Sequence, residues 1–254
     1  MALAQIDFVS QTLQMGMSIS AILPEKTIGS TLKPTPVLYL LHGLSNDHTS
    51  LLRKTRLECY LKDTDITVIM PCVHRSWYTN MCHGGQYWTF ISEEVPWIAR
   101  QFLNISTRRE DTFAAGISMG GYGAFKLALR RPELFAGAAS LSGSLDILTH
   151  ARRGDAEWRK MFETTFGSAK DLQSSDDNLL VLLEKVSSEK DKLPNLYQVC
   201  GTEDFLYRDN VTFHEKAKSL GIQVEYVEDK GIHDWEFWNL HIQEVIRWIQ
   251  KQIQ

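Results

Sequence analysis

The chain has 254 residues, of which 43% are hydrophobic and 23% charged, and its formal net charge is -4. This length and apolar content suffice for one large α/β domain or two small ones. The mild negative charge, without a basic run, argues against a nucleic-acid partner, and no apolar run approaches the ~18 residues that a membrane helix needs.

The N-terminus and the cysteines indicate a cytoplasmic protein. The first residues, MALAQIDFVSQ, lack the basic and apolar segments of a signal peptide. The four cysteines (Cys59, Cys72, Cys82 and Cys200) show no C-x-x-C spacing and are too few for a secreted disulfide scaffold. Reduced thiols are therefore favoured, and a Cys72–Cys82 disulfide is the minor alternative.

The first part of the chain predicts an antiparallel edge strand followed by buried strands. From Thr12 to Leu23, apolar residues alternate with mostly polar ones, which is typical of a half-buried antiparallel strand. The apolar runs Val37–Leu41 and Ile66–Met70 indicate strands that are covered on both faces. A helix is expected between them, around Leu51 to Leu61.

A long aromatic-rich loop follows, from Pro71 to Trp88. It has no periodicity, and loops of this length are often functional. Tyr87 and Trp88 at its end are equally consistent with lining a substrate pocket and with simple packing. The next segment predicts a helix with one apolar face, made of Val95, Ile98, Ala99 and Phe102.

The stretch from Asp111 to Leu129 carries the central motif of the chain. A short apolar run, Phe113–Ala115, leads into Gly116-Ile117-Ser118-Met119-Gly120, and a helical pattern follows at once. A G-x-S-x-G pentapeptide between a strand and a helix is typical of a nucleophile elbow, whose sharp turn exposes the serine hydroxyl. Ser118 is therefore the candidate nucleophile.

The second half predicts more strands and one insertion. Phe135–Leu141 is the next strand, whereas Leu145–Leu193 is charged, helix-prone and without strand signals. We interpret that segment as a helical insertion and a candidate cap over an active site. Two short strands follow at Leu196–Cys200 and Val224–Val227, with a helix near Thr212–Leu220 between them.

The final helix completes the expected architecture. Trp238–Ile249 is amphipathic, with an apolar face made of Ile242, Val245, Ile246 and Ile249. Strands that alternate with helices predict an α/β fold. We expect a mostly parallel central sheet with an antiparallel N-terminal edge, helices on both faces, and the helical insertion at 145–193 between strands 6 and 7. Without a repeat or linker, residues 1–254 are expected to form a single domain.

Two more motifs follow the last two strands. Gly201-Thr202-Glu203-Asp204 comes after one, and Gly231-Ile232-His233-Asp234-Trp235 comes after the other. Because parallel strands gather ligand chemistry at their carboxyl ends, we expect Asp204 and His233 to lie beside Ser118. The order serine, acid, histidine is that of α/β hydrolases.

These residue types fit acyl transfer. A serine hydroxyl needs an imidazole to take its proton, and the imidazole needs a carboxylate to fix its tautomer. The tetrahedral intermediate needs preorganised N–H donors. The N–H of Met119 follows the serine, and the N–H of Leu44 lies in the loop after an earlier strand. We interpret His42 as a residue that orders this loop rather than as a second base.

Several residues compete for the roles of acid and base. The rivals of Asp204 are Glu203, Asp209 and Asp146, but Asp204 lies in the turn directly after the strand. Two other histidines are expected in helices, where a solvated or packed imidazole is usual: His214 and His241. The spacing of His74 and His83 relative to the nearby cysteines matches no structural zinc site, so no metal is expected.

Four motifs, taken together, resemble a known family: LHGL (Leu41–Leu44), GISMGGYGAF (Gly116–Phe125), CGTEDFLY (Cys200–Tyr207) and GIHDWEFW (Gly231–Trp238). In this order across almost the whole chain, they resemble the esterase D-like branch of the α/β hydrolases, and within it the short bacterial tributyrin-esterase type. The resemblance implies a serine carboxylesterase without a metal or organic cofactor. It also implies a triad of Ser118, Asp204 and His233, with Leu44 and Met119 as oxyanion donors.

The same branch includes S-formylglutathione hydrolases, acetylxylan and feruloyl esterases, and mycolyl transferases. The chain is short for the first of these, and polysaccharide substrates are disfavoured because no carbohydrate-binding appendage or secretion signal is evident. We therefore expect a cytoplasmic carboxylesterase for small, short-acyl esters (acetyl to butyryl, tributyrin-like), with Tyr87, Trp88 and Trp235 in its substrate pocket.

Other functions stay open as alternatives. The first is S-formylglutathione hydrolase or another thioesterase, and acetylxylan or feruloyl esterase comes next. A non-catalytic binding protein on the same fold is least favoured, because no triad member is missing. The only expected partner is a small-molecule ester, and the resemblance is also compatible with a homo-oligomer.

Overall fold

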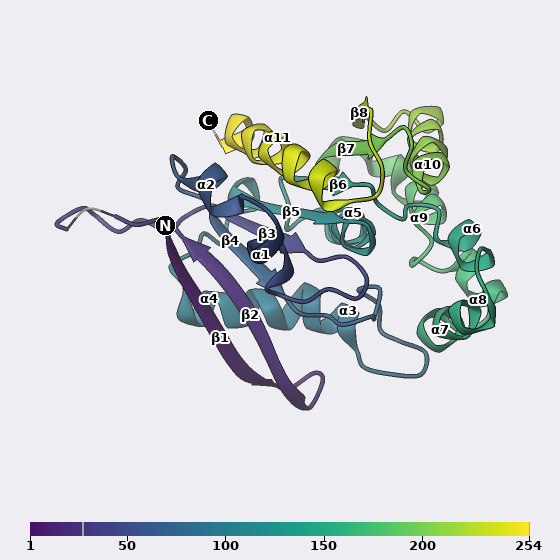
Figure 1. The fold of residues 1–254 in the computed structure, drawn as a ribbon, viewed down its shortest axis with the longest axis horizontal. Helices are drawn as coiled ribbons and strands as arrows, with labels where there is room; N and C mark the ends of the chain where they lie inside the picture. Colours follow the sequence, from purple (N-terminus) through teal and green to yellow (C-terminus); the bar gives the residue numbers. More distant parts are fainter. Residues whose placement is uncertain (27, 254) are drawn as a thin grey trace.

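One sheet of eight strands organises the protein (Figure 1), as seen in a computed structural model that describes residues 1–26 and 28–253. Its strands, in chain order, are β1 (Ala2–Ser10), β2 (Met15–Leu23), β3 (Val37–Leu41), β4 (Thr67–Pro71), β5 (Thr112–Ile117), β6 (Gly137–Leu141), β7 (Asn195–Gly201) and β8 (Glu225–Asp229). Their order across the sheet is β1-β2-β4-β3-β5-β6-β7-β8. The pairs β1–β2 and β2–β4 are antiparallel, and all the others are parallel.

Helices cover both faces of this sheet. Outside the insertion they are α1 (Ser50–Lys54), α2 (Leu57–Leu61), α3 (Tyr87–Thr89), α4 (Val95–Phe102), α5 (Met119–Arg130), α10 (Tyr207–Ser219) and α11 (Trp235–Ile253). A π-helical turn at Phe90–Glu94 joins α3 to α4. In β3, Val37, Tyr39 and Leu41 pack into the core with α4 and α5, whereas Leu38 and Leu40 pack into the core with α2 and α11. This two-sided burial explains the continuous apolar runs of the central strands.

The insertion between β6 and β7 is helical, as predicted. It contains α6 (Ile147–Arg152), α7 (Ala156–Phe166), α8 (Ala169–Ser174) and α9 (Leu179–Val186), and α6 to α8 lie beyond the edge of the sheet (Figure 1). A side-chain N-cap begins each helix: Asp146, Asp155, Ser168 and Asn178. The end of α7 is tied to the aromatic-rich loop, because Cys82 N–H and His83 N–H donate to the carbonyls of Thr165 and Thr164 at 2.8 and 2.9 Å.

The predicted α/β-hydrolase architecture is confirmed, and several details differ. The strand β1 was not predicted, and the expected helix at 51–61 is two short helices separated at Thr55 and Arg56. Phe102 was assigned to the buried face of α4 but is 60% exposed. The four cysteines, all within the described ranges, are free, so the Cys72–Cys82 disulfide is absent. Within the same ranges, each helix is too short or too polar to cross a bilayer.

Candidate active site

The turn between β5 and α5 holds Ser118 in a strained conformation. Its φ and ψ are 55° and -117°, a region that non-glycine residues occupy at a cost of roughly 1–3 kcal/mol. Glycine is required at Gly120, where a Cβ atom would lie 2.2 Å from the carbonyl oxygen of Leu41. The tight turn therefore places the serine hydroxyl at the carboxyl end of β5, as the motif predicted.

A hydrogen-bonded relay joins the three residues that the sequence singled out. The Nε2 atom of His233 lies 2.9 Å from the Oγ of Ser118, and its Nδ1 lies 2.8 Å from the Oδ2 of Asp204. The other carboxyl oxygen of Asp204 accepts from the N–H of Leu206 at 2.8 Å, and the side chain is fully buried. Because a carboxylate only accepts, Nδ1 of His233 carries the proton and Nε2 can take the serine proton.

Two aromatic rings contact the His233 imidazole. The ring centroids of Phe205 and Trp238 lie 4.5 and 4.8 Å from that of His233. The sequence analysis did not single out Phe205, and it left Trp238 with no role at the site. Both residues belong to motifs already noted, since Phe205 directly follows Asp204 and Trp238 lies in the first turn of α11. Their position within these motifs could have predicted that both rings lie at the site.

The loop after β3 brings the Leu44 N–H to the serine. A Cβ atom on Gly43 would lie 3.5 Å from the Cβ of Ser118. The Gly43 carbonyl accepts from Nδ1 of His42 at 2.8 Å and from the N–H of Asn46 at 3.2 Å. Because N–H and C=O point in opposite directions in a trans peptide, the Leu44 N–H points away from these donors.

The second predicted donor, the N–H of Met119, occupies the first position of α5. A helix leaves the N–H groups of its first turn without internal acceptors. Across residues 1–26 and 28–253, neither the Met119 N–H nor the Leu44 N–H has a hydrogen-bond acceptor. An oxyanion donor must have such an unpaired N–H group.

His42 holds the donor loop and is not a base. It is 1% exposed, its Nε2 accepts from the N–H of Val73 at 3.0 Å, and its Nδ1 donates to Gly43. Burial lowers the pKa of His42 to about 4, so the ring is neutral near pH 7. This geometry agrees with the loop-ordering role inferred from the sequence.

The rival acids are engaged elsewhere. Asp146 accepts from the N–H of Thr149 as the N-cap of α6, and Glu203 is exposed. Asp209 lies 1% exposed against Arg153, whose Nη2 donates to its Oδ1 at 2.6 Å. None of the three contacts His233 through a hydrogen bond.

The buried Asp209 makes the free energy of unfolding depend on pH. Burial raises its pKa from 3.8 to about 6, even though the adjacent Arg153 lowers it. The folded protein therefore holds this proton more tightly than the unfolded chain does. The stability that protonation contributes is complete below the unfolded pKa and is lost as the pH rises through about 6.

Asp209→Asn removes this titration and keeps the shape of the side chain. The free energy of unfolding of the variant, relative to wild type, should rise by about 1–2 kcal/mol between pH 5 and pH 8. Urea unfolding of both proteins at these two pH values measures it. A difference that does not change with pH would contradict the assignment.

Of the three aromatic residues expected in the pocket, Tyr87 lines a cavity. The cavity has a volume of about 830 Å³ and lies between the aromatic-rich loop and α7. A series of rings leads from it to the relay: Trp158 to His150 at 5.1 Å, His150 to Phe205 at 6.3 Å, and Phe205 to His233 at 4.5 Å. Ser118, Asp204 and His233 do not line the cavity themselves, and these rings are the contacts that connect it to the relay.

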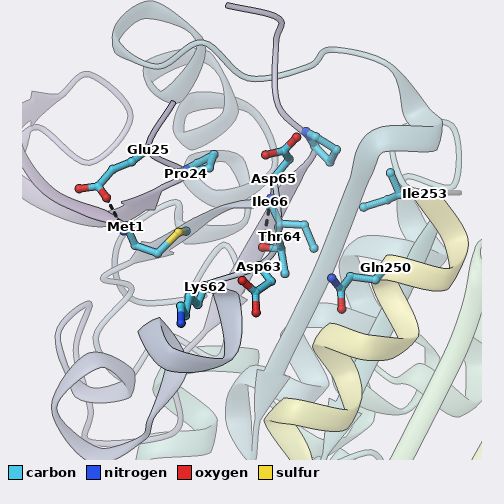
Figure 2. A pocket seen from close by; sticks show the side chains of 11 residues that line it. Met1, Pro24, Glu25, Lys62, Asp63, Thr64, Asp65, Ile66, Gln250 and Ile253 are labelled. Atoms are coloured by element: carbon cyan, nitrogen blue, oxygen red, sulfur yellow. Dashed lines mark hydrogen bonds and ion pairs between the residues drawn. The ribbon is translucent and has the colours of Figure 1, made fainter. Parts of the chain in front are cut away.

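A second hollow, of about 670 Å³, lies near the opposite end of the sheet (Figure 2). The N-terminal ammonium group of Met1 pairs there with Glu25 at 3.0 Å, next to Lys62 and the last turn of α11. In parallel sheets ligand chemistry gathers at the carboxyl ends of the strands, so this hollow is not the candidate site. Within residues 1–26 and 28–253, no group of three or more His, Cys, Asp or Glu side chains could hold a metal ion.

The other two expected pocket residues lie elsewhere. The Trp88 ring stacks on Arg130, with the guanidinium carbon 4.1 Å from the ring centroid, and Lys126 lies 5.2 Å away. The Trp235 ring contacts Trp238 edge-on at 5.1 Å, and Lys54 lies 4.8 Å from its centroid. Neither ring lines the cavity beside α7.

The chain is similar to known esterases and serine hydrolases. A family model described as "Putative esterase" matches residues 10–249. An acetyl esterase of Caldicellulosiruptor saccharolyticus is 33% identical over 266 residues, which covers 99% of each chain. Two solved structures from Staphylococcus aureus are each 33% identical over 98% of both chains. They are the fluorophosphonate-binding serine hydrolase FphF, with a TM-score of 0.91, and the S-formylglutathione hydrolase FrmB, with a TM-score of 0.87.

Proposed function

Because the chain belongs to the "Putative esterase" family of α/β hydrolases, we propose that it is a serine carboxylesterase for small, short-acyl esters. The observation that carries this proposal is the relay of Ser118, His233 and Asp204, with contacts of 2.9 and 2.8 Å. A serine in such a relay, beside two unoccupied N–H groups, has the parts that acyl transfer requires.

The first half of the reaction forms an acyl-enzyme. The Oγ of Ser118 attacks the ester carbonyl while Nε2 of His233 takes its proton. The N–H groups of Leu44 and Met119 stabilise the negative oxygen of the tetrahedral intermediate. As the intermediate collapses, the C–O bond to the alcohol breaks and Nε2 returns the proton to the leaving oxygen.

The second half releases the acid. A water molecule attacks the acyl carbonyl and gives its proton to Nε2 of His233. The second tetrahedral intermediate uses the same two N–H groups, and Ser118 leaves with the proton from the imidazole. Asp204 stabilises the imidazolium that forms in each half.

The short-acyl preference is supported by the full-length similarity to an acetyl esterase. Initial rates on p-nitrophenyl acetate, butyrate and decanoate test it directly. We expect kcat/KM to be highest for acetate or butyrate and at least ~10-fold lower for decanoate, since a pocket shaped for a short acyl chain must be displaced to admit a longer one, at a cost of about 1–3 kcal/mol. A kcat/KM that rises up to decanoate would reject the short-acyl part of the proposal.

S-Formylglutathione hydrolase activity is the second candidate function. It is favoured by the similarity to the Staphylococcus aureus FrmB structure over 98% of both chains. The adjoining cavity carries charges of both signs, from Arg75 and Lys160 and from Asp155 and Glu157, which suit a zwitterionic leaving group. A kcat/KM for S-formylglutathione that exceeds the value for p-nitrophenyl acetate at least tenfold would favour the thioester.

We also propose that the insertion acts as a cap on a single catalytic domain. It supplies Trp158 and His150, two of the rings between the cavity and His233, and α7 is bonded to the aromatic-rich loop. These contacts support a cap role for the insertion beside the cavity. The proposed reaction uses only groups of the chain itself, together with the ester and water.

A further inference from the structure

The hydroxyl of Tyr78 contacts the loop that carries the Leu44 N–H. Its Oη donates to the carbonyl oxygen of His42 at 2.8 Å, and the side chain is completely buried. The His42 carbonyl belongs to the peptide directly before the one that carries the Leu44 N–H. A hydrogen bond at this carbonyl fixes the plane of the first peptide, and the His42 ring fixes the second.

The helix α5 has a notch for the Tyr78 ring. A Cβ atom at Gly123 would lie 2.5 Å from the Cδ2 of Tyr78, so any larger residue there would displace the ring. Glycine within a helix is about 1 kcal/mol less favourable than alanine. The packed ring, with its buried apolar area, offsets that cost.

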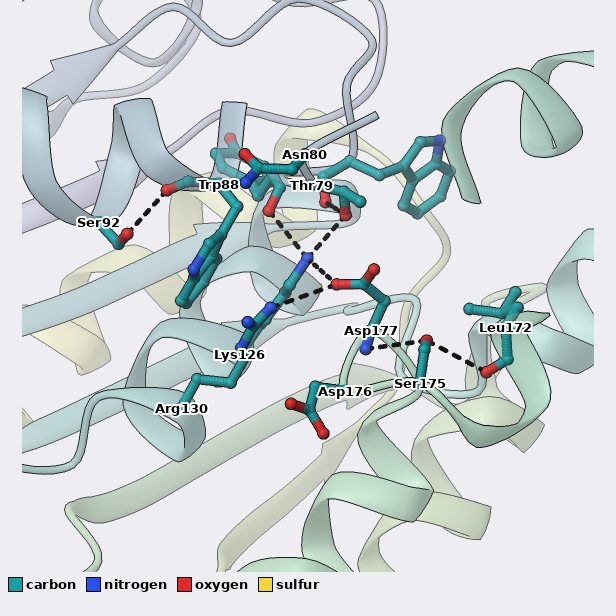
Figure 3. A network of polar contacts seen from close by, with 12 residues as sticks. Thr79, Asn80, Trp88, Ser92, Lys126, Arg130, Leu172, Ser175, Asp176 and Asp177 are labelled. Carbon is teal, nitrogen blue, oxygen red and sulfur yellow. Dashed lines mark hydrogen bonds and ion pairs between the residues drawn. The ribbon is translucent and has the colours of Figure 1, made fainter. Parts of the chain in front are cut away.

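The backbone of the same segment is strained and is tied to α5 as well. Trp77 and Tyr78 have φ values of 54° and 51°, in the left-handed region that non-glycine residues rarely adopt. The Tyr78 carbonyl accepts from Nζ of Lys126 at 2.9 Å, and the hydroxyl of Thr79 lies 2.7 Å from the same nitrogen (Figure 3). Strained backbone of this kind persists only where its surroundings over-determine it.

From these contacts we propose that Tyr78 is a positioning residue for the oxyanion hole. The helix α5 begins with Met119, the residue of one N–H donor, and also seats Tyr78 through Gly123 and Lys126. Tyr78 in turn holds the loop of the other donor, Leu44. It therefore keeps the two N–H groups at a fixed separation, which electrostatic stabilisation of the intermediate requires. The inference rests on the proposed esterase function.

Tyr78→Phe removes only the hydroxyl and keeps the ring in its notch. We expect kcat for p-nitrophenyl acetate to fall about 10-fold, less than the 10²–10³-fold typical for loss of a direct donor, with KM within about twofold. The inhibition constant of a trifluoromethyl ketone, which forms a tetrahedral adduct with the serine, should rise in parallel with the loss in kcat. A purely structural role would not produce this correlation.

Tyr122→Phe is the matched control. Tyr122 is equally buried on α5, but its hydroxyl donates to the carbonyl of Asp177 at 2.7 Å, away from the donor loop. The kcat and the inhibition constant of Tyr122→Phe should stay within about twofold of wild type.

Gly123→Ala is an independent second variant. It keeps the Tyr78 hydroxyl but displaces the ring, so it should lower kcat as Tyr78→Phe does.

The outcomes separate this inference from the proposed function. A wild type without turnover of any ester or thioester would overturn the proposed function and the role of Tyr78 with it. An active wild type whose kcat survives both Tyr78→Phe and Gly123→Ala would overturn only the positioning role. Equal losses in Tyr78→Phe and Tyr122→Phe would also overturn it, since they would indicate a general packing effect.

Discussion

Ser118→Ala is expected to lower kcat for p-nitrophenyl acetate by about 10⁴–10⁶-fold while the protein stays folded. The substitution removes the nucleophilic oxygen that forms the acyl-enzyme, and it leaves the N–H groups of Leu44 and Met119 in place. The residual rate would then come from substrate binding and oxyanion stabilisation alone. Steady-state kinetics, with circular dichroism to check folding, measure the loss.

Ser142→Ala is a control for the replacement of a buried serine whose φ is positive, as it is in Ser118. Ser142 follows β6, the strand beside β5, and is also a buried serine in the left-handed region, with φ 48°. It lies outside the relay, so its replacement should change kcat by less than about threefold. A fluorophosphonate probe should label the wild type and Ser142→Ala but not Ser118→Ala. Undiminished turnover in Ser118→Ala would remove the serine from the mechanism.

The residues of the relay could be predicted because strand ends position them. Ser118, Asp204 and His233 each follow a buried strand, and parallel strands bring their carboxyl ends to one edge whatever their separation in sequence. The same rule separated Asp204 from Asp209, which lies in the first turn of the next helix and is hydrogen-bonded to Arg153 instead. Local pattern and topology were sufficient at these positions.

Other features depend on contacts that no local pattern reveals. The alternation of β1 is masked because Leu3 and Val9, which are 62% and 76% exposed, are apolar on its outer face. Trp88 sits where a loop becomes a helix, and its direction is set by the cations of α5, far away in sequence. The contact of Tyr78 with His42 likewise joins residues 36 positions apart.

Lys126→Met is expected to lower the free energy of unfolding by about 2–4 kcal/mol, since two buried acceptors lose their donor at about 1–3 kcal/mol each, while Asp177 keeps Arg130 as a partner at 3.5 Å. Lys126 is 0% exposed on α5, and its Nζ lies 2.5 Å from the Oδ1 of Asp177, which precedes α9 (Figure 3). It also donates to the carbonyl of Tyr78 and to the hydroxyl of Thr79. Methionine fills a similar volume but leaves these acceptors without their donor. Urea unfolding at pH 7 measures the loss.

The neighbouring ion pair of Lys185 and Asp176 provides a control variant for Lys126→Met. Lys185 pairs with Asp176 at 2.7 Å with both side chains about half exposed, so Lys185→Met should cost at most about 1 kcal/mol.

Burial lowers the pKa of Lys126 from 10.5 to about 8, so between these pH values the unfolded chain holds the proton that the folded protein has released. Stability then rises with pH in the wild type relative to Lys126→Met, and the gap between the two should widen from pH 8 to about pH 10. A gap that narrows over this range would contradict the lowered pKa of Lys126. Equal losses in the two lysine variants would show that the buried Lys126 side chain does not hold the insertion, α5 and the Tyr78 segment together.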